Sequence, residues 1–280
     1  MQNIAVIGSG TMGSGIAQVA ASSGLNVKLF DTTPEILQKA TARIGDSLQR
    51  LVKKGTLSAA DAEQIPKRIS THTDYSAAAD VDAVIEAVFE DETVKKHTWV
   101  KLNAVCREDA IFGTNTSSIS ITQIAASVKR PERFIGMHFF NPVPVMKLVE
   151  VIRGNRTDDA TCASVVELSK RMGKTPIEVN DFPGFVSNRV LMPLINEAIF
   201  AVHEGVAKPE AIDEIFKLGM AHPMGPLTLA DFIGLDVCLN IMEVLQRGFG
   251  DPKYRPCPLL RQMVAAGKLG RKSGQGFYKY

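Results

Sequence analysis

Short apolar runs alternate with amphipathic stretches along the first part of the chain. The runs are rich in β-branched residues, as buried parallel strands are. They predict strands at 4–7, 27–31, near 69, and at 83–87, 110–114, 134–138, 148–152 and 177–180. Helical periodicity fills the stretches between them. This alternation predicts an α/β domain in which helices cover the faces of a parallel, doubly wound sheet.

The pattern changes near residue 185. Beyond it, helical segments punctuated by glycine and proline follow one another, and the only further strand candidate is a short run at 277–280. We place a domain boundary at Pro183-Gly184. The predicted organisation is a sheet domain over 1–184 and a smaller all-α domain over 185–280.

The connection between the second and third strands is too long for a single crossover helix. Thr33 is a favourable N-cap and Pro34 fits the first helical position, so a helix begins there. It ends at Gly55, a favourable C-terminal residue. Ser58 then begins a second, shorter helix. We predict a helical hairpin at about 33–67, inserted in the sheet domain.

Composition and charge exclude several classes of protein. The 280 residues carry 32 Lys and Arg against 30 Asp and Glu, a formal net charge of +2. This balance argues against disorder and against a nucleic-acid partner. No apolar run approaches the ~20 residues of a membrane helix. The four cysteines lack the spacing of a disulfide framework or a zinc site, so we expect reduced thiols and no metal. The first predicted strand begins at residue 4, which leaves no room for a leader before it, so we expect a cytoplasmic location.

A glycine-rich turn follows the first predicted strand. Gly8-Ser9-Gly10-Thr11-Met12-Gly13 opens an Ala-rich helix, and this G-x-G-x-x-G pattern lets the backbone approach a diphosphate at the helix N-terminus. Asp31 ends the second strand, where a carboxylate accepts hydrogen bonds from an adenosine ribose and repels a 2′-phosphate. The two features predict a Rossmann-type site that prefers NAD. Thr32 and Thr33 leave NADP as a possible cofactor.

His138 is the strongest catalytic candidate among the five histidines. It ends a predicted strand, at the edge where open α/β sheets bind ligands. Glu150 on the adjoining predicted strand can orient the imidazole and raise the basicity of its other nitrogen. A structural histidine at a strand end is the alternative. No pair of histidines has metal-ligand spacing.

Two groups of polar side chains each allow two interpretations. Asn115-Thr116-Ser117-Ser118 follows another apolar strand, where these residues either bind a polar ligand or cap the next helix. Four basic residues share one face of the first hairpin helix: Lys39, Arg43, Arg50 and Lys54. That face is either solvated or a clamp for a phosphorylated ligand.

Together these residues resemble the short-chain (S)-3-hydroxyacyl-CoA dehydrogenases, which include 3-hydroxybutyryl-CoA dehydrogenases. The resemblance covers essentially the whole chain. It rests on the turn at 8–13, Glu86-Ala87 with Glu90 and Lys95, the loop at 115–118, the stretch 137–151, Pro183-Gly184-Phe185 with Asn188-Arg189, and the motifs at 222–226 and 274–278. The stretch 137–151 is long and typical of this family.

The resemblance implies an oxidoreductase that interconverts (S)-3-hydroxyacyl-CoA and 3-oxoacyl-CoA, with 3-hydroxybutyryl-CoA and acetoacetyl-CoA as the expected pair. It implies that His138 and Glu150 are the catalytic pair, with His138 as general acid and base. Ser117 and Asn188 complete the substrate site. NAD is the implied cofactor.

The same resemblance assigns binding roles. The implied cofactor residues are Gly8, Gly10, Thr11, Met12, Gly13, Asp31, Glu90, Lys95, Asn115 and Ser117. The implied residues for the CoA moiety are Arg50, Lys53 and Lys54, beside Ser117 and Asn188 at the acyl end. The apolar helices of so small a second domain favour burial against a second copy of the chain, so we expect a homodimer.

Two alternatives stay open on sequence grounds. A sugar-acid (gulonate-type) dehydrogenase of the same superfamily shares the glycine-rich turn, but such enzymes tend to carry His-Pro-x-Asn-Pro-Pro where this chain has His138-Phe139-Phe140-Asn141-Pro142-Val143. A non-catalytic NAD-binding protein is the other. Such a protein has no need of His138 and Glu150.

Overall fold

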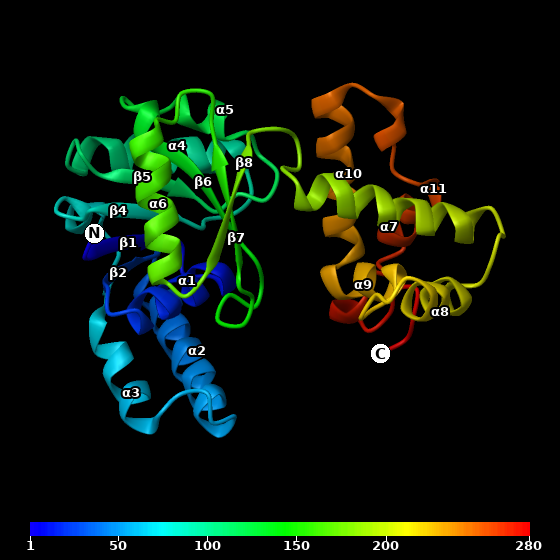
Figure 1. Ribbon diagram of the computed structural model, residues 1–280, viewed down its shortest axis with the longest axis horizontal. Coiled ribbons are helices and arrows are strands. Elements are labelled where there is room, and N and C mark those ends of the chain that lie inside the picture. The colour runs from blue at the N-terminus through cyan, green and yellow to red at the C-terminus, as the bar shows by residue number, and fades with distance from the viewer. The chain divides into compact units, whose positions relative to one another are not determined.

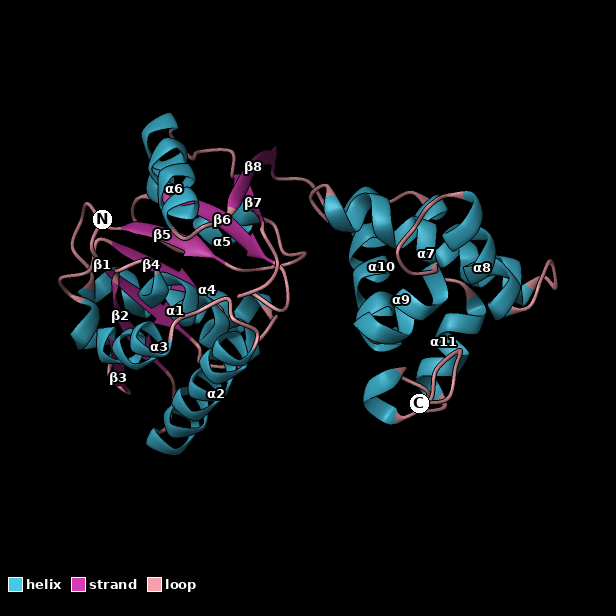
Figure 2. Cartoon of the chain, turned by 60° about the horizontal axis from the view of Figure 1, so that its bottom comes forward, coloured by secondary structure: helices cyan, strands magenta, loops and turns pink.

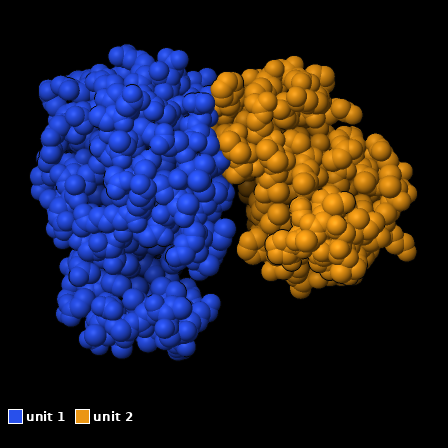
Figure 3. Space-filling view, in the orientation of Figure 1, with its two compact units in different colours: residues 1–181 blue, residues 182–280 orange.

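The computed structural model describes residues 1–280, and the chain folds as two units, Met1–Asp181 and Phe182–Tyr280 (Figure 1, Figure 3). The first contains the sheet and its helices, and the second is helical. The division between the units falls shortly before the Pro183-Gly184 boundary that the sequence predicts.

An eight-stranded sheet forms the centre of the first unit, in the order β3-β2-β1-β4-β5-β6-β7-β8. The strands are β1 (Asn3–Ile7), β2 (Asn26–Phe30), β3 (Ile69–His72), β4 (Ala83–Glu86), β5 (Ile111–Thr114), β6 (Phe134–Phe139), β7 (Leu148–Arg153) and β8 (Thr175–Asn180). Each run that the sequence predicts as a strand in this unit forms one, with ends shifted by no more than two residues.

The sheet is mixed: the expectation of a parallel sheet is confirmed for the first six strands and is wrong for the pairing of β6 with β7. The first six strands run parallel, β6 and β7 pair antiparallel, and β8 is parallel to β7. A parallel pair needs a crossover of a dozen or more residues. The segment 140–147 is shorter than that, so the chain reverses. The reversal places His138 directly opposite Glu150.

Helices cover both faces of the sheet (Figure 1). The helices of this unit are α1 (Thr11–Ser22), α2 (Pro34–Lys53), α3 (Ala59–Gln64), α4 (Glu92–Val105), α5 (Ile121–Ala125) and α6 (Asp159–Arg171). Apolar side chains of α1 and α6 join the main core on one face. On the other face, the Trp99 ring of α4 packs against those of Phe112 and Phe134, with centroids 5.0 and 4.9 Å away. The predicted α/β fold is confirmed.

The predicted helical hairpin is also confirmed, as α2 and α3 (Figure 2). Thr33 Oγ1 accepts a hydrogen bond from the N–H of Ile36 at 3.4 Å and caps α2. Ser58 Oγ caps α3 in the same way, and Gly55 follows α2 with a φ of +70°. Leu48 and three other apolar residues of α2 are buried in the main core, so one face of the hairpin packs against the sheet domain.

Five α-helices build the second unit: α7 (Ser187–His203), α8 (Pro209–Gly219), α9 (Pro226–Ile233), α10 (Leu235–Phe249) and α11 (Pro258–Ala265). Two buried carboxylates hold the C-terminal segment against these helices. Asp213 accepts a hydrogen bond from the Tyr278 hydroxyl at 2.9 Å, and Asp231 accepts from the N–H groups of Phe277 and Tyr278 at 3.0 Å. The run at 277–280 forms an isolated bridge and no strand.

Candidate active site

The glycine-rich turn joins β1 to α1 and leaves the start of the helix open. Gly8 has a φ of +91°, and a Cβ there would lie 2.6 Å from the carbonyl oxygen of Ala87. A Cβ at Gly13 would lie 1.7 Å from the carbonyl oxygen of Gly8, so only glycine fits. No side chain caps α1 at Gly10, and its first turn has no acidic residue. Its backbone N–H groups therefore suit a negatively charged diphosphate.

Asp31 follows β2 and is fixed by hydrogen bonds. The N–H and the hydroxyl of Ser9 each donate to Asp31 Oδ2 at 2.7 Å, and the N–H of Thr32 donates to Oδ1 at 2.7 Å. Partial burial acts to raise the pKa of Asp31, but these hydrogen bonds outweigh it, and the pKa is lowered. The side chain is therefore held as a carboxylate beside the glycine-rich turn.

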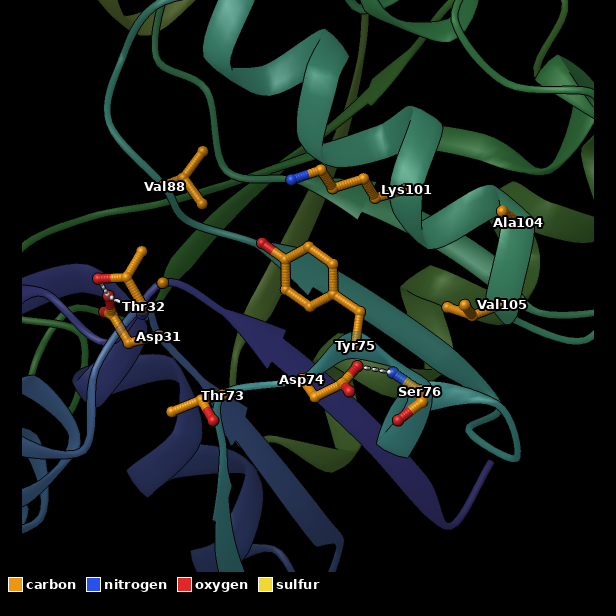
Figure 4. A pocket seen from close by; sticks show the side chains of 11 residues that line it. Asp31, Thr32, Thr73, Asp74, Tyr75, Ser76, Val88, Lys101, Ala104 and Val105 are labelled. Carbon is orange, nitrogen blue, oxygen red and sulfur yellow. Dashed lines mark hydrogen bonds between the residues drawn. The ribbon is translucent and has the colours of Figure 1, made fainter.

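A hollow of about 720 Å³ opens next to Asp31 (Figure 4). Gly8 and Thr32 line it beside Asp31, and the Tyr75 ring, Val88 and Lys101 line the opposite part. The hollow thus combines an acceptor carboxylate, an aromatic ring and aliphatic surface next to the glycine-rich turn. This combination fits the adenosine half of a dinucleotide. Burial raises the pKa of Tyr75, so its phenol stays protonated.

Lys95 is completely buried in α4 between two carboxylates. Its Nζ lies 2.8 Å from Glu86 Oε1 and 3.2 Å from Glu90 Oε2. Glu86 is also completely buried, and its other oxygen accepts from the Thr114 hydroxyl at 2.7 Å. This network joins β4, β5 and α4 at the carboxyl edge of the sheet.

Glu90 organises the loop at 115–118. Its Oε1 accepts from the Thr116 hydroxyl at 2.6 Å and from the N–H of Ser117 at 2.7 Å, and Ser118 also donates to it. Burial acts to raise the pKa of Glu90, but Lys95 and these donors outweigh it, and the pKa is lowered. The interpretation of this loop as a helix cap is wrong, because Ser120 caps α5.

His138 and Glu150 form a close pair across β6 and β7. The Nδ1 of His138 lies 2.8 Å from Glu150 Oε2, and the two residues are 8% and 3% exposed. Because a carboxylate only accepts, Nδ1 carries the proton, which makes Nε2 the basic nitrogen of the neutral ring. The Phe140 ring packs against the imidazole with its centroid 4.5 Å away. The pair can therefore exchange a proton with a ligand at Nε2.

The segment 140–147, which links the strands of this pair, is fixed from β8. Lys174 lies immediately before β8, and its Nζ donates to the carbonyl oxygens of Val143 and Met146, the latter at 2.7 Å. Burial lowers the pKa of Lys174 to about 8. Asn115 Oδ1 accepts from the N–H of Phe139 at 2.9 Å and fixes the end of β6 to the neighbouring loop. Both contacts restrict the backbone next to His138.

The remaining predicted site residues lie in two places. Asn188 is buried in the first turn of α7, in the second unit. Arg50, Lys53 and Lys54 are exposed at the end of α2. Arg43, on the same helix, is exposed as well, and its guanidinium also donates to Ser9 and Ser14 at the glycine-rich turn.

Two structural features bear on other functions. The structure has no group of three or more His, Cys, Asp or Glu side chains arranged to hold a metal ion. No helix has both the length and the apolar character required to cross a membrane.

Comparison with known protein families decides the relationship. Residues 3–182 match the 3-hydroxyacyl-CoA dehydrogenase NAD binding domain, and residues 184–280 match the C-terminal domain of the same family. The chain belongs to the 3-hydroxyacyl-CoA dehydrogenase family. Its fold has the corresponding parts, a Rossmann-type NAD-binding domain followed by a helical domain. Neither the sugar-acid alternative nor the non-catalytic one is favoured.

Individual members of the 3-hydroxyacyl-CoA dehydrogenase family are similar over their whole length. The chain is 56% identical to the "Probable 3-hydroxybutyryl-CoA dehydrogenase" of Bacillus subtilis, covering 100% of this chain and 98% of that protein. It is 53% identical to the 3-hydroxybutyryl-CoA dehydrogenase of Clostridioides difficile, covering 99% of each. The crystal structure of (S)-3-hydroxybutyryl-CoA dehydrogenase from Ralstonia eutropha has a TM-score of 0.98 at 52% identity, covering 100% of this chain and 99% of that one.

Several residues of the site carry no signal in the sequence. Tyr75 lines the hollow from a short 3-10 helix, Tyr75–Ala78, and Lys101 lines it from α4, and no motif marks either of them. Lys174 reaches the 140–147 segment only through the pairing of β7 with β8. Such contacts depend on tertiary structure, which neither periodicity nor motif spacing encodes.

Proposed function

We propose that this chain interconverts (S)-3-hydroxyacyl-CoA and 3-oxoacyl-CoA, with the four-carbon pair 3-hydroxybutyryl-CoA and acetoacetyl-CoA as its substrates. The observation that carries this proposal is the buried His138–Glu150 pair, in the same unit as a glycine-rich turn and a hollow that suits adenosine. The printed names of the full-length relatives support the substrate class.

His138 is the proposed general acid and base. In the oxidising direction, Nε2 accepts the proton of the 3-hydroxyl group as the hydrogen on C3 leaves as hydride. In the reducing direction, the imidazolium returns that proton to the 3-oxo oxygen. Glu150 keeps Nδ1 protonated and stabilises the positive charge that the ring acquires. The glycine-rich turn and Asp31 would hold NAD, which would supply the hydride acceptor for oxidation and, as NADH, the hydride donor for reduction.

The other site residues bind and orient the reactants. We assign Ser117 and Asn188 to the reacting oxygen or the thioester carbonyl, which reduces the geometric search before reaction. Arg50, Lys53 and Lys54 are assigned to the phosphates of CoA, since all three are exposed cations at one end of the hairpin. Lys95, Asn115 and Glu90 are assigned to the cofactor side. Free thiols at all four cysteines support a cytoplasmic location.

The test of this function is the loss of nicotinamide absorbance during acetoacetyl-CoA reduction, with NADH and NADPH in parallel. We expect rapid loss with NADH and a kcat/KM at least about tenfold lower with NADPH, because Asp31 repels the 2′-phosphate. Faster reaction with NADPH would overturn the role of Asp31. Absence of turnover with both, despite measurable NADH binding, would overturn the proposed reaction.

A homodimer formed through the second unit is part of the proposal. Ile215 and Leu218 share one face of α8 and are 57% and 78% exposed. Two further apolar side chains are also exposed: Met220 follows the end of α8, and Phe232 belongs to α9, which contacts α8. An apolar surface of this kind is expected to be covered by another protein surface, here a second copy.

Leu218→Glu is expected to shift the protein from dimer to monomer, because a carboxylate would be buried without a partner. Light scattering after gel filtration should give about twice 30.4 kDa for the unaltered chain and for the control Val100→Glu, on an exposed position of α4. A mass of one chain for the unaltered protein, or a dimer for Leu218→Glu, would contradict this assignment.

A further inference from the structure

Arg43 lies in the middle of α2 and contacts the glycine-rich turn. Its Nη1 donates to the carbonyl oxygen of Ser9 at 3.2 Å and to Ser14 Oγ at 3.0 Å. The Ser14 hydroxyl donates to the same Ser9 carbonyl at 2.7 Å. Ser9 and Ser14 are 1% and 2% exposed. Since these two serines flank residues 10–13, the guanidinium is bonded to both ends of the segment that begins α1.

The contact brings a positive charge to this segment. Arg43 is exposed to solvent, and both of its acceptors in the protein are neutral oxygens, so these hydrogen bonds do not neutralise its charge. The first turn of α1 has no acidic residue either. The guanidinium therefore adds to the partial positive charge of the helix N-terminus. The two together favour a dianionic group over the turn.

Ser9 also connects Arg43 to Asp31. Its carbonyl oxygen accepts from Arg43, while its N–H and hydroxyl both donate to Asp31 Oδ2 at 2.7 Å. One buried residue thus joins the carboxylate assigned to the ribose with the cation beside the turn. A change at Arg43 acts on the conformation of the turn as well as on its charge.

We propose that Arg43 is a positioning residue for the dinucleotide, which holds the glycine-rich turn and places a positive charge beside the cofactor's diphosphate. This inference rests on the proposed NAD-dependent function. It separates Arg43 from Arg50, Lys53 and Lys54, which we assign to CoA. The hairpin then contributes to the binding of both ligands. Arg43, in the middle of α2, acts on the dinucleotide, and the three basic residues at the end of α2 bind CoA.

The test is equilibrium binding of NADH, measured by nucleotide fluorescence, in Arg43→Gln, Arg43→Lys and the control Lys67→Gln. We expect Arg43→Gln to raise the NADH Kd about fivefold to tenfold, because one charge near the diphosphate is lost. Arg43→Lys keeps the charge but loses the fork that spans two acceptors, so its Kd should rise less, by about two- to threefold. Lys67 is an exposed cation of the same hairpin, and its variant should bind normally.

Competition with ADP and with adenosine identifies the part of the dinucleotide involved. Arg43→Gln should weaken the binding of ADP about as much as that of NADH, and it should leave the Kd for adenosine unchanged within about twofold. Added salt should weaken NADH binding more in the unaltered protein than in Arg43→Gln. An equal loss of affinity for ADP and for adenosine would overturn the assignment of Arg43 to the diphosphate.

Two further outcomes would overturn the inference, provided circular dichroism shows that the variants fold. One is an unchanged NADH Kd in Arg43→Gln. The other is a rise in the KM for acetoacetyl-CoA with NADH binding intact, which would return Arg43 to the CoA clamp. Because NADH binding is measured without turnover, its result is independent of whether the proposed reaction is correct.

Discussion

His138→Gln is expected to lower kcat by about 10²- to 10⁴-fold with little change in the affinity for NADH. Glutamine keeps a polar side chain of similar size but cannot exchange a proton with the 3-oxygen. Glu150 would stay next to a neutral amide, in place of a ring that acquires a positive charge during oxidation. The measurement is the steady-state rate in both directions, with NADH binding determined separately.

The matched control for this variant is His203→Gln, the same change at an exposed position at the end of α7. It should leave kcat within about twofold of the unaltered enzyme, as most exposed substitutions do. A His138→Gln enzyme with nearly normal turnover would remove His138 from the mechanism. Glu150→Gln should reduce kcat less than His138→Gln, because Glu150 acts through the ring.

Lys95→Met is expected to lower the free energy of unfolding by about 3–5 kcal/mol, the range for breaking a buried ion pair by removing one partner. The methionine fills the space of the lysine stem, but Glu86 keeps a buried carboxylate without its counter-charge. Urea unfolding followed by circular dichroism measures the loss. Lys95→Met combined with Glu86→Gln should recover part of it, since no unpaired charge then remains at Glu86.

The control for this prediction is next to it in the sequence. Lys96 lies on the exposed side of α4, where it pairs with Glu92 at 2.6 Å. Lys96→Met should change the free energy of unfolding by less than about 1 kcal/mol, because exposed ion pairs contribute little. Similar losses of unfolding free energy in the two variants would show that burial does not determine how much the Lys95–Glu86 pair contributes to stability.

The sequence predicts those parts of the fold that depend on local signals. Thr33, Pro34 and Gly55 define the first hairpin helix because capping and backbone preference act within a few residues. Strand positions follow from the apolar runs, because buried strands leave a continuous signature. The position of His138 at the end of a strand follows in the same way.

Properties that depend on the direction and packing of elements are not predictable from these signals. Apolar runs do not give the direction of β7, so its antiparallel pairing with β6 is apparent only from the structure. That pairing is what places Glu150 opposite His138. The role of Glu90 is a similar case, because its carboxylate meets Ser117 only when β4 and β5 are adjacent.

Arg43 illustrates the limit of helical periodicity. Its spacing from Arg50 places both on one face of α2, and the sequence assigns that face a single role. Arg43 donates to Ser9 and to Ser14 of α1, whereas Arg50 is exposed near the end of α2. Periodicity defines a face, whereas the neighbouring element decides what each position along that face contacts.

The measurement that tests the central claim most directly is the pH dependence of hydride transfer in single turnovers, followed by nicotinamide absorbance in both directions. General acid and base catalysis by His138 predicts that reduction of acetoacetyl-CoA slows as the pH rises, since it needs the imidazolium. Oxidation of 3-hydroxybutyryl-CoA should accelerate as the pH rises, and His138→Gln should abolish both trends. Flat profiles in the unaltered enzyme, or trends that persist in His138→Gln, would contradict the account.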